Sequence, residues 1–188
     1  ATVFTTENPV SDGEFDTTNN DSQDTDDFTL TWTAVADAPT LAVDDALVKE
    51  DSSIFVPVEA TLADTDGSEF LTITVEGIPS TWGFSGTNWV QTGANTYEVT
   101  VPAGDNYNGG FTLTPPADSD VDLTGIKVTA TSTETSNNDA ASVSEEIDVV
   151  VDALFDNPTV DGLDNAGAEN TALDVDITGA AGDTDGSE

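Results

Sequence analysis

Short runs in which apolar and polar residues alternate occupy most of the chain. The runs from Leu71 to Val75 and from Ile147 to Val151 show this pattern most clearly. A period of two residues places successive side chains on opposite faces of a β-strand, and no stretch has the period of a long amphipathic helix. The expected strands are Thr40 to Val48, Ile54 to Thr61, Leu71 to Val75, Trp89 to Gln91, Tyr97 to Val101, Phe111 to Thr114, Ile126 to Thr133 and Val143 to Val151.

Turn-forming residues separate these runs. The expected turns are Asp66-Gly67, Asn108-Gly109-Gly110, Pro115-Pro116 and Asn137-Asn138-Asp139. Seven to nine short strands in roughly 120 residues are typical of a sandwich of two antiparallel sheets with Greek-key connections. The pattern therefore predicts an all-β fold built of β-sandwich modules.

An internal repeat sets the size of one module. The hexapeptide from Asp64 to Glu69 recurs unchanged from Asp183 to Glu188. The two copies are 119 residues apart. Without a gap, the same offset of 119 residues places Asp37 on Asp156 and Glu50 on Glu169. An offset that preserves six consecutive residues indicates tandem modules. We expect residues 1–36 to be the C-terminal part of one repeat, 37–155 a complete repeat and 156–188 the start of a third. We also expect the chain to be a window on a longer array.

The charge of the chain limits its partners. Of 188 residues, 38 are Asp or Glu and two are Lys, which gives a formal net charge of −36. Such a surface repels nucleic acid and anionic membranes, since both are bound through Lys and Arg. Neighbouring carboxylates also repel each other within a Debye length of about 8–10 Å. High external salt or bound divalent cations would relieve this repulsion, and both favour an extracellular location.

The absence of three residue types narrows the chemistry. The chain contains no Cys, His or Met, which excludes disulfides, zinc sites built on thiolate or imidazole ligands, and the usual nucleophile–base pairs of hydrolases. A pair of carboxylates could serve a glycosidase, but nothing singles out one pair among so many acids. We therefore expect no enzyme. No apolar run reaches the 18 residues of a membrane span, so we expect no membrane insertion.

Several acidic residues have the spacing of calcium ligands. Calcium takes 6–8 oxygen ligands, so carboxylates from separate loops must converge on one point. In the repeated loop Asp64 and Asp66 are two residues apart, and Gly67 permits a positive-φ turn that returns Glu69. The expected calcium ligands are Asp37, Glu50, Asp64, Asp66, Glu69, Asp118 and Asp120. The alternative is that these acids are solvated loop residues of a salt-adapted protein.

A cluster of aromatic residues suggests a second kind of site. Trp82, Phe84, Trp89, Tyr97 and Tyr107 lie within 26 residues of sequence. Exposed coplanar rings would indicate a carbohydrate-binding module. Buried rings would instead indicate core residues on paired strands and a cover over one end of the sandwich, which is the interpretation we favour.

The motifs resemble those of a known class of repeat. The segments from Pro39 through Glu50-Asp51 to Leu71, and from Phe111 to Asp120, are similar to the cadherin-like or Ig-like tandem repeats of giant bacterial RTX-type adhesins. The resemblance covers nearly the whole chain. It implies type I secretion, extracellular calcium and a stalk that extends an adhesive tip from the cell surface. Its partners would be neighbouring repeats of the same chain, and a filament or surface-layer subunit that assembles with other copies stays open as an alternative.

Overall fold

A computed structural model describes residues 2–6, 21–25, 29–162 and 164–182, the first two segments by their backbone alone. The chain divides into two compact units, Ala1–Thr33 and Ala34–Glu188. In the first unit, β1 (Thr2–Thr6) and β2 (Asp21–Thr25) form an antiparallel pair. The second unit contains a β-sandwich and a further antiparallel pair, β13 (Thr159–Gly162) with β14 (Ile177–Ala180). Among the described residues no helix has the length and apolarity needed to cross a membrane.

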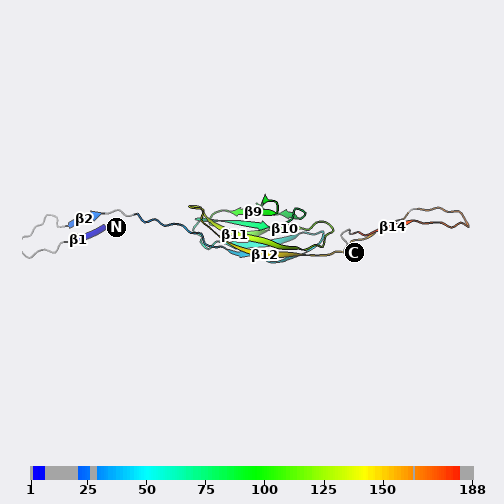
Figure 1. The fold of residues 1–188 in the computed structure, drawn as a ribbon, viewed down its shortest axis with the longest axis horizontal. Helices are drawn as coiled ribbons and strands as arrows, with labels where there is room; N and C mark the ends of the chain where they lie inside the picture. The colour runs from blue at the N-terminus through cyan, green and yellow to red at the C-terminus, as the bar shows by residue number, and fades with distance from the viewer. Residues whose placement is uncertain (1, 7–20, 26–28, 163, 183–188) are drawn as a thin grey trace, which may run out of the picture. The chain divides into compact units, whose positions relative to one another are not determined.

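Two sheets form the sandwich (Figure 1). In spatial order, the four-stranded sheet consists of β3 (Thr40–Ala42), β5 (Ile54–Thr61), β10 (Tyr107–Thr114) and β7 (Gly83–Ser85). The six-stranded sheet consists of β4 (Ala46–Lys49), β12 (Ala140–Asp152), β11 (Leu123–Glu134), β6 (Glu69–Glu76), β9 (Thr96–Val101) and β8 (Val90–Gly93). The chain crosses between the sheets at every step from β3 to β8, and again from β9 to β10 and from β10 to β11.

The core lies between the two sheets and follows the predicted alternation. In β5 the side chains of Val56, Val58 and Ala60 are buried and the residues between them are exposed. In β6 the buried apolar residues are Leu71, Ile73 and Val75. Phe111 is the largest fully buried side chain. The predicted all-β class is confirmed, and the paired sheets form an Ig-like β-sandwich.

Three local expectations differ from the structure. The expected strand from Thr40 to Val48 is two strands, because β3 pairs antiparallel with β5 whereas β4 pairs in parallel with β12 in the other sheet. Strand β7 is not among the expected strands, because its three residues are too few to show an alternating pattern in the sequence. The turn expected at Asn108-Gly109-Gly110 is wrong, since these residues lie within β10. The two glycines there accommodate aromatic rings packed close to the strand.

The loops of the sandwich gather at its two ends because the strands run lengthwise (Figure 1). We call the end reached by residues 34–37 the N-terminal end, and the end from which residues 152–156 leave the C-terminal end. Strand β5 joins them: Glu50 precedes its first residue, Ile54, by four positions, and Asp64 follows its last, Thr61, by three. Eight residues of strand span about 26 Å, so acids at the two ends belong to separate sites.

Candidate metal centres at the two ends of the sandwich

Two buried glutamates face each other at the N-terminal end. Glu69 is the first residue of β6 and Glu134 the last residue of β11, and they are partners in the antiparallel register of these strands. Both side chains are buried, with 1% and 4% of their surface exposed. Two carboxylates in this arrangement repel each other and have lost most of their hydration, so a third, positively charged group would stabilise both.

The two carboxylates differ in their hydrogen bonds. Glu69 accepts one from the backbone N–H of Asp37 at 3.1 Å and one from the hydroxyl of Ser132 at 2.6 Å. The Oε2 atom of Glu134 is buried and accepts no hydrogen bond from any residue that the structure describes. A buried oxygen without a partner is costly. A cation beside this oxygen would give it a partner, because carboxylate oxygens are ligands of hard cations.

The pKa of Glu134 reflects the same surroundings. Burial raises this pKa above its ordinary value of 4.5, and the negative charges of Glu69, Asp66 and Asp64 raise it further. The acids of the repeated loop therefore add to the negative charge around Glu134.

Hydrogen bonds shape the repeated loop. Asp66 donates its backbone N–H to Oδ1 of Asp64 at 3.1 Å, and Ser68 donates its own to Oδ1 of Asp66 at 2.8 Å. The hydrogen bonds from the Ser68 side chain and backbone lower the pKa of Asp66. Gly67 has φ +92°, the positive value expected from the sequence. The Ser68 carbonyl accepts hydrogen bonds from the backbone N–H and hydroxyl of Thr135, which hold the loop beside the end of β11.

The linker is attached to the same end of the sandwich. The backbone N–H of Ala36 donates to Oδ2 of Asp139 at 2.9 Å, and the Asn137 amide donates to the Ala34 carbonyl at 2.7 Å. With the bond from Asp37 to Glu69, three hydrogen bonds join residues 34–37 to the module that follows them. Asp37 is thus placed beside the glutamate pair, although its contact there is through its backbone.

A second acidic cluster lies at the C-terminal end. One carboxylate oxygen from each of Asp51, Asp118 and Asp156 lies within 4.8 Å of the others. The backbone N–H of Asp118 also donates to Oδ1 of Asp51 at 3.2 Å. Asp51 and Asp118 both have positive φ values, 59° and 54°. These conformations bring together acids that are 67 residues apart in sequence.

Glu50, next to Asp51, forms hydrogen bonds to the segment in which the chain leaves the sandwich. It is 1% exposed, its backbone N–H donates to the Asp152 carbonyl at 3.0 Å, and its Oε1 accepts a hydrogen bond from the N–H of Leu154. Asp120 is exposed and is not among the three acids brought together. The structure thus divides the expected ligands into Asp37, Asp64, Asp66 and Glu69 at one end and Glu50, Asp118 and Asp120 at the other.

Sequence reasoning missed three residues of these clusters. The sequence could have indicated two of them as ligands, because Asp51 directly follows Glu50 and Asp156 is the counterpart of Asp37 under the repeat offset. Nothing in the sequence indicates Glu134, because it is one acid among 38 and joins the site only through strand pairing. The second copy of the hexapeptide, residues 183–188, lies outside the described residues.

Both clusters offer only oxygen atoms as ligands. Carboxylates from separate loops, with backbone carbonyls nearby, are the donor set that calcium prefers. The unpartnered oxygen of Glu134 could act as a ligand without losing a hydrogen bond. The donor set of both ends thus fits a hard divalent cation.

Comparison with known proteins adds no family assignment. The sequence matches no family model and no curated protein significantly. Solved structures similar to this chain include the sixth cohesin of scaffoldin B from Acetivibrio cellulolyticus (13% identity, TM-score 0.44, covering 62% of this chain and 100% of that one). Another is AggA, the major subunit of aggregative adherence fimbriae type I from Escherichia coli (12%, 0.41, 64% and 100%). A third is a non-cellulosomal cohesin from Archaeoglobus fulgidus (15%, 0.38, 63% and 92%). At TM-scores below 0.5 we draw no function from these likenesses, and the sandwich is assigned from its own strand pairing.

Proposed function

We propose that this chain is a structural extender of a secreted bacterial surface adhesin, in which calcium bound at the ends of β-sandwich modules makes a string of repeats rigid. The observation that carries the proposal is the buried, unpartnered Oε2 of Glu134, which lies with Glu69 at the end of two paired strands. The acids of the repeated loop add negative charge to the same place. Calcium would supply the missing partner and remove the repulsion.

The repeat offset suggests how consecutive modules share the cation sites. Asp37 lies beside Glu69 at the N-terminal end of its module, and its counterpart Asp156 lies with Asp51 and Asp118 at the C-terminal end of the same module. A linker aspartate of this array therefore has contacts to the module before it in one copy and to the module after it in the other. We propose that each junction holds cations between two neighbouring repeats, which fixes the angle between them.

The edges of the sandwich favour a stalk over a filament built by strand pairing. The edge strands β3 and β7 have three residues each, and β4 and β8 have four, whereas the inner strands have 6 to 13. Short edge strands give another chain little backbone to pair with. A stalk of covalently linked modules lengthens through the ends of the modules and therefore needs no exposed edge strand.

An extracellular location follows from the same chemistry. The low calcium of a cytoplasm would leave the carboxylates repelling each other, which opposes folding before export, and millimolar external calcium would then drive folding. This agrees with secretion of an unfolded chain through a type I system. The proposed role is mechanical and requires no catalysis.

Thermal unfolding of residues 1–188 in EDTA and in millimolar calcium tests the proposal. Binding to the folded state alone stabilises it by RT ln(1+[L]/Kd), about 2.7 kcal/mol at a hundredfold excess over Kd. We expect a large rise in Tm with calcium and a much smaller one with magnesium at matched ionic strength. An equal rise in magnesium or NaCl would show general charge screening, and the acids would then be the solvated loops of a salt-adapted protein.

A further inference from the structure

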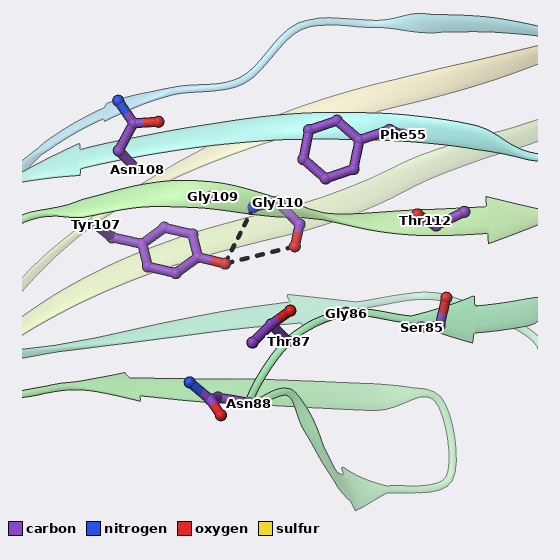
Figure 2. A pocket seen from close by; sticks show the side chains of 10 residues that line it. All are labelled: Phe55, Ser85, Gly86, Thr87, Asn88, Tyr107, Asn108, Gly109, Gly110 and Thr112. Carbon is purple, nitrogen blue, oxygen red and sulfur yellow. Dashed lines mark hydrogen bonds between the residues drawn. The ribbon is translucent and has the colours of Figure 1, made fainter.

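A hollow lies on the four-stranded sheet, and none of the acids of the two end clusters lines it. It has a volume of about 660 Å³ and is lined by residues of β5, of β10, and of the end of β7 with the loop that follows (Figure 2). The hollow forms because β7 pairs only with Thr112, Leu113 and Thr114 of β10. Beyond Ser85 the chain leaves the sheet, so among the described residues no strand pairs with the first half of β10 on that side.

Glycines bring aromatic rings close to the floor of the hollow. A Cβ atom on Gly110 would lie 2.2 Å from the carbonyl oxygen of Val56 and 2.7 Å from Cζ of Phe55. A Cβ on Gly109 would lie 2.8 Å from Cζ of Tyr107. No larger residue fits at either position without displacing a ring. Phe55 is nevertheless 56% exposed, and its ring lies beside the hollow (Figure 2).

Hydrogen bonds hold the floor in place. The Tyr107 hydroxyl accepts hydrogen bonds from the Gly110 N–H at 3.1 Å and from Nε1 of Trp89 at 3.0 Å. The same Nε1 lies 3.0 Å from the Gly110 carbonyl. The N–H and C=O groups of Gly110 are therefore already bonded to side chains, so an added peptide strand could not pair with them. A ligand would meet a preformed surface, which lowers the entropic cost of binding.

The lining is uncharged in a strongly acidic chain. One residue in five is Asp or Glu, yet the hollow is lined by none. Its polar side chains are neutral hydrogen-bonding groups on two separate segments, Ser85, Thr87 and Asn88 on one and Asn108 and Thr112 on β10. An exposed ring beside neutral donors and acceptors fits a ligand that has both an apolar face and hydroxyl groups. The hexopyranose ring of a sugar has this combination.

We propose that this hollow binds a neutral saccharide. One sugar ring would place its C–H face on Phe55, and its hydroxyls would bond to the hydroxyl and amide groups of the surrounding side chains. The absence of carboxylates excludes strong recognition of a cation, and the charge of the whole chain disfavours an acidic glycan. A stalk with such a site would attach laterally to a neutral polysaccharide along its length.

Phe55 also has a purely structural explanation. Aromatic side chains commonly cover glycines in sheets and stabilise them. That role accounts for the ring over Gly110, but it does not require Thr87, Asn88 and Asn108 around it. The two explanations predict different results for the variants below.

Titration of the ¹⁵N-labelled chain of residues 1–188, in calcium, tests the proposal by NMR. The probes are cellohexaose, maltohexaose and mannohexaose, with hexagalacturonate as the acidic control. We expect at least one neutral hexasaccharide to shift the amides of Gly86, Asn88, Asn108 and Gly109 saturably, and hexagalacturonate to shift none. No saturable shift with any neutral probe, or shifts confined to other regions, would overturn the proposal. So would stronger shifts of these amides by an uncharged extended peptide.

Variants separate binding from packing. Phe55→Ala should weaken saccharide binding about tenfold, since an aromatic contact contributes on this scale. Asn108→Ala should weaken it as well with little effect on Tm, which keeps the test valid if Phe55→Ala does not fold. Val90→Ala is the matched control, because Val90 is exposed on the neighbouring β8 and outside the hollow. A loss of Tm in Phe55→Ala with unchanged affinity would leave Phe55 only a structural role and would contradict the proposal.

Discussion

Glu69 and Glu134 are direct partners across strands β6 and β11, and both carboxylates are buried at the end of the sandwich. Two acids placed opposite each other destabilise a sheet unless something compensates. Glu69 has hydrogen-bond donors from the linker and from Ser132, whereas one oxygen of Glu134 has none among the described residues. The pair therefore makes the stability of this end depend on what occupies the space beside it.

Neutralising Glu134 should have opposite effects with and without calcium. In EDTA, Glu134→Gln removes the repulsion with Glu69, Asp64 and Asp66, so Tm should rise. In calcium it removes a ligand, so the gain in Tm on adding calcium should be mostly lost. Differential scanning calorimetry in the two buffers measures both effects. Glu145→Gln, an exposed acid on β12, is the control and should change neither. An unchanged calcium gain in Glu134→Gln would remove Glu134 from the site.

The two ends should bind calcium independently. Asp64→Asn with Asp66→Asn should abolish binding at the N-terminal end alone, and Asp51→Asn with Asp118→Asn binding at the C-terminal end alone. The sites lie at opposite ends of β5, and effects at distant sites add. Isothermal titration calorimetry should show each double variant losing one class of site, and the combined variant losing both. Asp161→Asn, an exposed acid on β13, serves as control. Loss of all binding in either double variant would indicate one coupled site.

Mild acid should partly replace calcium. The pKa of Glu134 is raised on folding, so the folded state binds a proton more tightly than the unfolded state. The stability linked to this group is fully present below its ordinary pKa of 4.5 and is lost as pH rises through its raised pKa. In EDTA, lowering the pH toward 4.5 should therefore raise Tm more in the natural chain than in Glu134→Gln.

Asp66 sets the lower pH limit for this comparison of Tm values. Its pKa is lowered on folding, so its contribution is present above its ordinary value of 3.8 and is lost as pH falls through the lowered value. The comparison of the natural chain with Glu134→Gln is therefore best made above pH 4.5. Parallel Tm profiles of the two proteins over that range would show that the stabilisation by acid comes from the net charge and not from Glu134.

The aromatic core should be sensitive to truncation. Phe111 is fully buried, and its ring centroid lies 5.1 Å from that of Phe84 and 5.6 Å from that of Trp89. Phe111→Ala should lower the free energy of unfolding by about 3–5 kcal/mol, measured by urea denaturation in calcium. Phe155→Ala is the control, since Phe155 is 90% exposed and should change this free energy by less than about 0.5 kcal/mol. Equal effects would mean that Phe111 does not belong to a packed core.

Packing decided the roles of the aromatic residues expected from the sequence. Trp82 is buried, and Tyr97 stacks on Phe84 with ring centroids 3.8 Å apart against the core. The interpretation of these rings as core residues is confirmed. The ring that stands exposed beside a hollow is Phe55, which lies outside the aromatic cluster in sequence.

The sequence by itself determined the strands with clear alternation, such as Leu71 to Val75, because alternation fixes which face of a strand is buried wherever the strand is placed. It also determined the turn at Gly67, since local backbone geometry sets the need for positive φ. The tertiary structure alone decided that Glu50 and Asp64 lie at opposite ends and that Glu134 faces Glu69. These relations depend on pairing between distant strands. Local pattern carries no information about that pairing, because many partners satisfy the same alternation.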